Sequence, residues 1–165
     1  MTRLIATLRR INRALTRVLI AVAGLLLVGM MALTCADIFL RQAWRPVPGS
    51  VELVGFFGAV VTAFALSFTQ NRREHIAVDI LFQHYPAVLR RIVGAISYAA
   101  CIAFCVVAAW QIGKLGVRIL TTGEVTETLR IIFYPFVFAV ALGFGTIALS
   151  FLADLLACVA GEDAR

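Results

Sequence analysis

Hydrophobic positions along this chain form four long runs that contain no charged residue. The runs cover residues 18–36, 53–71, 92–113 and 131–153. Each run is close to the roughly 20 residues that a helix needs to cross a hydrocarbon core of about 30 Å. No polar face recurs along the runs, as it would on the surface helices of a soluble domain. Because backbone groups in lipid must be paired within their own segment, the pattern predicts four transmembrane helices, at about 18–38, 51–71, 92–113 and 131–154.

The first 17 residues follow a different, helical period. The apolar positions are Leu4, Leu8, Ile11 and Leu15, and the basic ones are Arg9, Arg10, Arg13 and Arg17. The two sets lie on opposite sides of a helical wheel, which predicts an amphipathic interfacial helix. We expect it to lie along the inner leaflet with its arginines facing anionic lipid.

The expected organisation is a cytoplasmic arm at 1–17, a four-helix transmembrane domain at 18–160 and a short cytoplasmic tail at 161–165. The first run has a long basic leader and no small-x-small site after it, so we interpret it as a permanent helix rather than a cleaved signal peptide.

Composition and charge agree with a membrane protein and set its orientation. The chain has 165 residues, 62% hydrophobic and 15% charged, whereas soluble domains carry about 25% charged residues. Ten of the 15 Lys and Arg residues fall on the side of the chain termini. Both termini are therefore predicted to be cytoplasmic. The net charge of +6 is explained by the membrane surface, because no nucleic-acid-binding signature accompanies it.

The predicted spans hold no charge in their apolar middle, where a charged side chain usually marks an ion or substrate path. Asp37, Glu52 and Asp154 all lie near helix ends. Asp37 precedes Arg41 by four residues, a spacing that pairs the two on one helix face.

Haem and thiol chemistry find no support in the sequence. Both histidines, His75 and His84, fall in the loop between the second and third spans, where they cannot hold an intramembrane haem. The cysteines, Cys35, Cys101, Cys105 and Cys158, form no C-x-x-C motif. We therefore expect no cofactor, no metal and no enzymatic activity.

Small residues at helical spacing predict close helix packing. Gly55 and Gly58 lie in the second span, and similar stripes occur in the third and fourth. Such stripes let helix backbones approach in lipid, either within the chain or against a partner. We expect Gly55 and Gly58 to contribute to a partner interface.

The connection between the first two spans, "RQAWRPVPGSVEL", is the most distinctive loop. Pro48 stiffens the turn and Gly49 relaxes it. Ser50 is expected to cap the second helix, and Glu52 in the first turn suits the helix dipole.

Two segments together carry a family resemblance. After the second span comes "NRREHIAVDIL", which includes Arg73, Glu74, His75 and Asp79. An Asp37 and Arg41 pair, then "PVPGSVEL", then an uncharged helix and this segment resemble the DctQ-like small membrane subunit of tripartite ATP-independent periplasmic (TRAP) transporters. The chain departs from the family in having a single Glu52 after the PGS motif and no early proline before the fourth span.

The resemblance implies a non-catalytic subunit in the bacterial inner membrane. Its partners would be a large membrane subunit, which it scaffolds, and a periplasmic binding protein that delivers an organic acid for sodium-coupled uptake. The motif residues would form or support the interface: Asp37, Arg41, Pro48, Gly49, Ser50, Glu52, Gly55, Gly58, Arg73, Glu74, His75 and Asp79. The solute is not encoded in this chain, because in the family the other two components select it.

Two other functions remain open at this point. A self-sufficient small multidrug-type transporter would carry a buried Glu in its first helix, and this first span has none. The membrane anchor of a respiratory enzyme would carry a haem band. The segment with Glu74, His75 and Asp79 offers three polar side chains on a wet bend, so we interpret it as a structural contact rather than a reactive cluster.

Overall fold

A computed structural model describes residues 2–43, 45, 47–71 and 87–160 of the chain. Four helices make up nearly all of this part: α1 (Thr2–Ala43), α2 (Ser50–Asn71), α4 (Ala87–Thr122) and α5 (Tyr134–Ala160). Each is long and apolar enough to cross a membrane. The all-helical prediction with four spans is therefore confirmed.

The helices extend beyond the apolar runs that predicted them. The arm at 1–17 and the first span form one uninterrupted helix of 42 residues, about 63 Å long at 1.5 Å per residue. Helix α4 continues nine residues past the predicted end at 113. Both helices exceed a hydrocarbon core of about 30 Å, so they must tilt or project from it.

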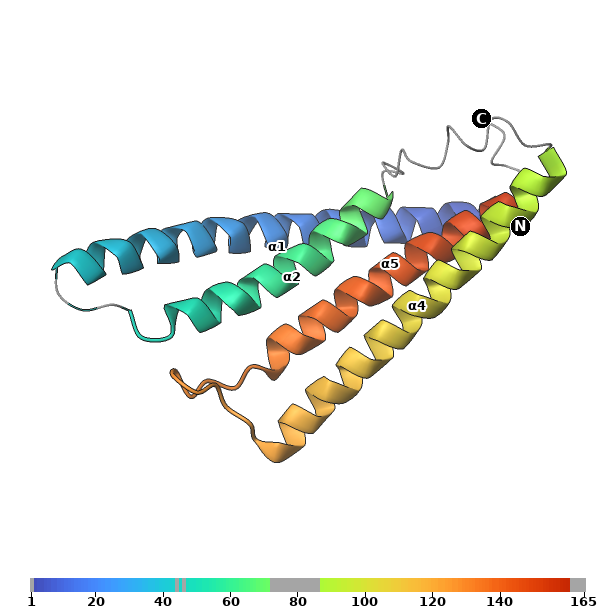
Figure 1. Ribbon diagram of the computed structural model, residues 1–165. Coiled ribbons are helices and arrows are strands. Elements are labelled where there is room, and N and C mark those ends of the chain that lie inside the picture. Colours follow the sequence, from blue (N-terminus) through green and yellow to red (C-terminus); the bar gives the residue numbers. More distant parts are fainter. Residues whose placement is uncertain (1, 44, 46, 72–86, 161–165) are drawn as a thin grey trace.

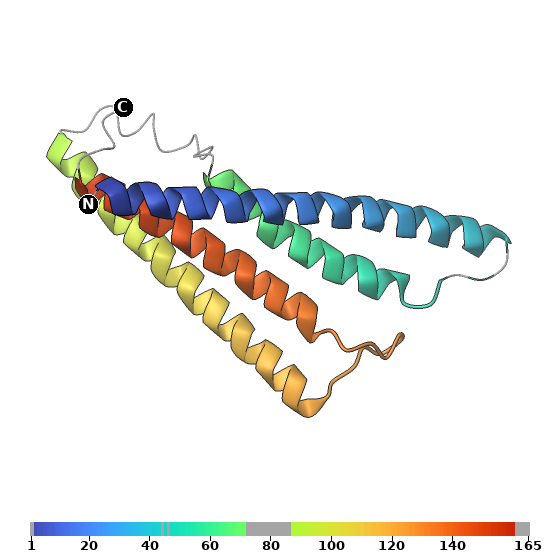
Figure 2. The ribbon, with the colours of Figure 1, turned by 180° about the vertical axis from the view of Figure 1, so that it is seen from behind.

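The four helices pack as an open layer rather than a closed bundle. Helix α5 lies in the middle and contacts α4, α2 and α1, while α4 has extensive contact only with α5. In the most apolar stretch of each helix, 33% of α5 is buried inside the molecule, whereas only 6% of α4 is buried. As Figures 1 and 2 show, α1 and α4 converge toward one end of the molecule and diverge toward the other.

The two ends of this layer differ in what they contain. The end where the helices converge carries the beginning of α1 and the end of α5, and is called the terminal end (Figure 1). The opposite end carries the α1–α2 and α4–α5 connections, and is called the loop end. The apolar core lies between them.

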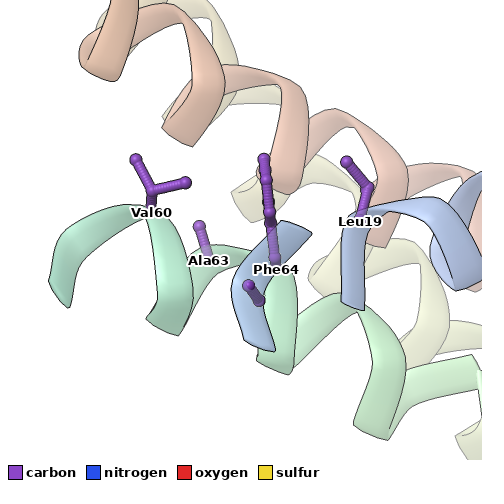
Figure 3. Packing of buried hydrophobic residues seen from close by; sticks show 5 residues of the cluster. Leu19, Val60, Ala63 and Phe64 are labelled. Atoms are coloured by element: carbon purple, nitrogen blue, oxygen red, sulfur yellow. The ribbon is translucent and has the colours of Figure 1, made fainter. Parts of the chain in front are cut away.

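The core is small and joins α1 to α2 and α5. Leu19 and Ala23 of α1 pack with Val60, Ala63 and Phe64 of α2 (Figure 3). These five side chains are at most 6% exposed. Such tight burial between long apolar helices fits association in lipid by close packing.

Glycine allows the closest helix crossing in the core. A methyl group built on Gly143 of α5 would lie 2.8 Å from the Cβ of Ala63 and 3.2 Å from its carbonyl carbon and oxygen. No side chain fits there without moving α2 relative to α5. The Gly143 stripe predicted from sequence therefore serves packing inside this chain.

Candidate functional site: the loop clasp

The residues singled out by sequence around Asp37 and Glu52 meet at the loop end, in a polar network that we call the loop clasp. It comprises Asp37 and Arg41 at the end of α1, residues 47–53, and residues 126–131 of the α4–α5 connection. The third segment is far from the first two in the chain, and the carboxylates of Asp37 and Glu52 join the segments by accepting hydrogen bonds from backbone amides.

A tight turn begins the clasp. The Ser50 amide donates to the Val47 carbonyl oxygen at 3.3 Å, and Gly49 has a φ of 72°. Pro48 at the second turn position and Gly49 at the third are the residues that a type II turn prefers. The Leu53 amide then donates to the Gly49 carbonyl oxygen at 3.1 Å, which starts α2 directly after the turn.

Asp37 fastens this turn to the end of α1. Its Oδ1 accepts a hydrogen bond from the Val47 amide at 2.8 Å, and its Oδ2 accepts one from Arg41 at 3.1 Å. The Asp37 residue is only 8% exposed. The predicted pair with Arg41 is present, and its carboxylate also holds a loop ten residues away.

Glu52 joins the first connection to the second. Its Oε1 accepts from the Thr128 amide at 2.9 Å, and its Oε2 accepts from the Leu129 amide at 3.4 Å. A carboxylate that receives backbone amides is a strong, charge-assisted acceptor. Glu52 thus orders a loop that lies 76 residues further along the chain.

Thr126 shapes the second connection so that its amides face Glu52. Its amide donates to the Ile131 carbonyl oxygen at 3.1 Å, and its Oγ1 accepts from the Ile131 amide at 3.2 Å. Arg130 closes the turn with a φ of 51°. Val125 and Ile132 form an antiparallel bridge at the base of this loop.

An apolar contact reinforces the polar one. A Cβ built on Gly49 would lie 2.2 Å from Cγ of Leu129 and 2.5 Å from its Cδ1. The Leu129 side chain therefore lies directly on the Gly49 backbone. Gly49 is required both for its left-handed φ and for this close approach.

Aromatic rings pack beneath the clasp between α2 and α5. The Phe56 ring stacks on Phe133 with centroids 5.4 Å apart and on Phe136 at 5.5 Å. Phe57 also contacts Phe136, at 5.8 Å and a tilted angle. These stacked rings form an apolar layer beneath the clasp.

The sequence-predicted residues are only partly brought together. Asp37, Arg41, Pro48, Gly49, Ser50 and Glu52 all lie in the clasp. Ser50 is the first residue of α2, and its capping role stays a prediction. Arg73, Glu74, His75 and Asp79 fall outside the described residues, so their predicted contact stays a prediction.

The two predicted interface glycines face different surroundings. Gly55 is exposed and has nothing within 4 Å of a built Cβ. Gly58 is partly covered, with the Met30 methyl of α1 at 3.7 Å. Gly55 therefore lies on an open face of α2, whereas Gly58 borders the α1–α2 contact within the chain.

The four arginines of the basic arm also differ in their surroundings. Arg10, Arg13 and Arg17 are exposed. Arg9 instead turns toward α5, and its Nη2 lies 3.8 Å from Oδ1 of Asp154. Arg9 therefore contributes to a contact within the chain, while the other three arginines stay exposed.

Sequence reasoning missed the Glu52 partner loop. Nothing in "EVTETLR" shows that its backbone amides reach across to another hairpin. The available signal was the pair of threonines flanking Glu127, since threonine hydroxyls readily organise turns. In the part of the chain that the structure describes, no group of three potential metal ligands occurs. The interactions that the structure shows in the clasp are hydrogen bonds that join its loops.

One comparison with known proteins identifies a match. The sequence model of a family described as "Tripartite ATP-independent periplasmic transporters, DctQ component" matches residues 30–161. No curated protein and no solved structure matches the chain. The matched range includes all of the clasp and excludes the whole N-terminal arm.

Proposed function

Because this chain belongs to the DctQ component family of the tripartite ATP-independent periplasmic transporters, we propose that it scaffolds the large membrane subunit of such a transporter. The large subunit carries out sodium-coupled uptake of an organic acid, and a periplasmic binding protein delivers that acid. The chain itself catalyses no reaction and couples no ion. It lies in the bacterial inner membrane with both termini in the cytoplasm.

The observation that supports this role most is the use of the carboxylates at the span ends. Asp37 and Glu52 are occupied by backbone amides of the chain's own loops, and Asp154 lies beside Arg9. A coupling site needs charged or polar groups that an ion or solute can reach. These carboxylates instead stabilise a fixed shape, as a scaffold requires.

The open architecture also favours a scaffold. Helix α4 packs on one side only, and large apolar side chains of α1 and α4 are exposed, among them Leu25 at 74%, Phe39 at 76% and Phe104 at 70%. An open layer of long, tilted helices offers a broad face to another membrane protein. We propose that Gly55 of α2 and the loop clasp border that contact, and that Arg10, Arg13 and Arg17 bind anionic lipid.

Co-purification tests the scaffold role. The chain is co-expressed with a tagged large subunit, either unchanged or as Gly55→Leu or Ala103→Leu, which add bulk to exposed positions of α2 and α4 respectively. We expect Gly55→Leu to reduce recovery of the chain with the large subunit, because its backbone could no longer approach a partner helix. Full recovery of both variants contradicts the proposed faces, and failure of the unchanged chain to co-purify contradicts the role.

A further inference from the structure

The terminal end contains a set of buried polar side chains that the loop clasp does not involve. They come from three helices: Asn12 and Thr16 from α1, Ser67 and Gln70 from α2, and Thr146 and Ser150 from α5. Their exposures run from 0% for Ser67 to 5% for Gln70. We call this set the polar junction.

Four atoms of the polar junction have no hydrogen-bond partner in the described structure. They are Asn12 Oδ1, Thr16 Oγ1, Ser67 Oγ and Gln70 Oε1. The other end of the Asn12 amide is engaged, since Nδ2 donates to Ser150 Oγ at 2.6 Å. Buried polar atoms are nearly always paired, because leaving one unpaired costs the full desolvation penalty of that group. Four such atoms in one set indicate a missing partner.

The two unpaired hydroxyls also forgo the bond that their own helices offer. Thr62, Thr69 and Thr146 each donate to the carbonyl oxygen four residues earlier, at 2.8 to 3.1 Å. Thr16 and Ser67 make no such bond although they are the most deeply buried hydroxyls. Their hydroxyls are therefore oriented for a partner other than the helix backbone.

Helix register places these residues at one level. Leu19 of α1 packs with Phe64 of α2 in the core, and Ala63 of α2 meets Gly143 of α5. One turn closer to the terminal end, these contacts continue into Thr16, Ser67 and Thr146. The next turn brings Asn12 to Ser150, and Gln70 follows Ser67 by three residues on α2. The junction thus lies between the apolar core and the Arg9–Asp154 pair.

The chemistry of the four atoms matches water. The oxygens of Asn12 and Gln70 only accept, and the hydroxyls of Thr16 and Ser67 both donate and accept. A water molecule donates two hydrogen bonds and accepts two, and buried waters typically make about three. A cation fits less well, because none of the four atoms belongs to a carboxylate that would offset its charge.

We propose that the polar junction binds a small cluster of ordered water molecules that link α1 to α2 and α5. This water attaches the first half of α1 to the other two helices. It explains why the arm buries Asn12 and Thr16 while Ile11 stays 56% exposed. The proposal does not depend on the transporter role.

Isosteric removal of single hydroxyls tests the proposal, with the full-length chain in lipid nanodiscs. Thr16→Val and Ser67→Ala each remove one junction hydroxyl, and Thr62→Val removes an exposed hydroxyl that bonds to its own helix. If water is bound, we expect each junction variant to lower the unfolding midpoint by about 2–4 °C and Thr62→Val to leave it nearly unchanged. Pulsed X-ray labelling in ¹⁸O-water should also mark Phe64, and the label should be lost in both junction variants.

Two results overturn the proposal. If the junction is dry, removing an unpaired hydroxyl relieves its desolvation cost, so Thr16→Val and Ser67→Ala raise the midpoint and Phe64 stays unlabelled. If a cation occupies it, sodium raises the midpoint of the unchanged chain relative to potassium, and both junction variants abolish that rise. A chain that behaves identically in both salts and loses stability on hydroxyl removal supports the water cluster.

Discussion

The loop end and the terminal end of this protein differ in whether their polar side chains have hydrogen-bond partners within the described chain. At the loop end, Asp37 and Glu52 each receive backbone amides from their own connections. At the terminal end, Asn12, Thr16, Ser67 and Gln70 retain atoms without a partner inside the described chain. Both sets lie at the margins of the apolar cluster formed by Leu19, Ala23, Val60, Ala63 and Phe64.

This difference indicates what fixes each end. A carboxylate that accepts amides from a loop is a self-contained device, so the loop end holds its shape through the chain's own contacts. The terminal end also has polar side chains that could form a hydrogen-bond network. That network depends on bound water to pair its remaining atoms. The predictions below test this contrast.

Gly49→Ala is expected to cause the largest loss at the loop end. The substitution places a side chain at a φ of 72° and against Leu129, 2.2 Å from its Cγ. Together these effects should lower the free energy of unfolding by about 2–4 kcal/mol, measured by thermal or denaturant unfolding in detergent.

Gly123→Ala is the matched control, since Gly123 has a φ of 67° and open space around it. It should cost only about 1–2 kcal/mol of backbone strain. Adding Leu129→Ala to Gly49→Ala should remove the extra loss of unfolding free energy that Gly49→Ala shows over Gly123→Ala. Equal losses for Gly49→Ala and Gly123→Ala would show that the contact between the two loops is unimportant.

Gly143→Ala should disturb the helix crossing that lies between the two ends. Its new methyl group would press on Ala63 at 2.8 Å, at a cost of about 1–3 kcal/mol. Gly145→Ala, two residues further along, meets nothing within 4 Å. It should therefore be neutral or slightly stabilising. Similar behaviour of both variants in the same unfolding assay would argue against tight α2–α5 packing.

Glu52→Gln should loosen the second connection without unfolding the helices. The neutral amide is a weaker acceptor for the Thr128 and Leu129 amides. Their hydrogen exchange, followed by mass spectrometry, should become several-fold faster. Glu127→Gln in the same loop changes an exposed carboxylate and serves as the control. Unaltered exchange in Glu52→Gln would mean that the carboxylate does not order this loop.

Arg9→Gln should have the smallest effect. Its ion pair with Asp154 is 3.8 Å long and its side chain is 37% exposed. Such pairs contribute less than about 1 kcal/mol and weaken with salt. The unfolding midpoint of Arg9→Gln should be slightly below that of the unchanged chain at low salt, and the two midpoints should converge at high salt. The midpoint of Arg10→Gln should equal that of the unchanged chain. A large, salt-independent loss would assign Arg9 a deeper role at the terminal end.

The number and type of the helices could be predicted from sequence, because four uncharged runs of about 20 residues have one good solution in lipid. Their ends could not. Residues 114–122 contain Lys114 and Arg118, which end the apolar run, yet α4 continues to Thr122. Helix propensity and tertiary contact set that boundary, whereas hydropathy alone does not. The continuity of α1 through the arm has the same origin.

The residues of the loop clasp could likewise be predicted only in part. Pro48, Gly49 and the Asp37–Arg41 spacing are local signals, so the turn and the ion pair could be predicted. The bond from Glu52 to Thr128 spans 76 residues, and only the fold brings the two together. The polar junction was hidden for another reason: Asn12 and Thr16 lie in a segment whose apolar and basic stripes predict a surface helix.

Solute uptake by the chain alone tests the central claim most directly. Proteoliposomes would contain the chain by itself, the large subunit by itself, or both, and would be given a sodium gradient and the binding protein loaded with its organic acid. The account predicts uptake only when both membrane subunits are present, because this chain uses its carboxylates to hold its own loops. Sodium-driven uptake by liposomes that contain this chain alone would contradict it.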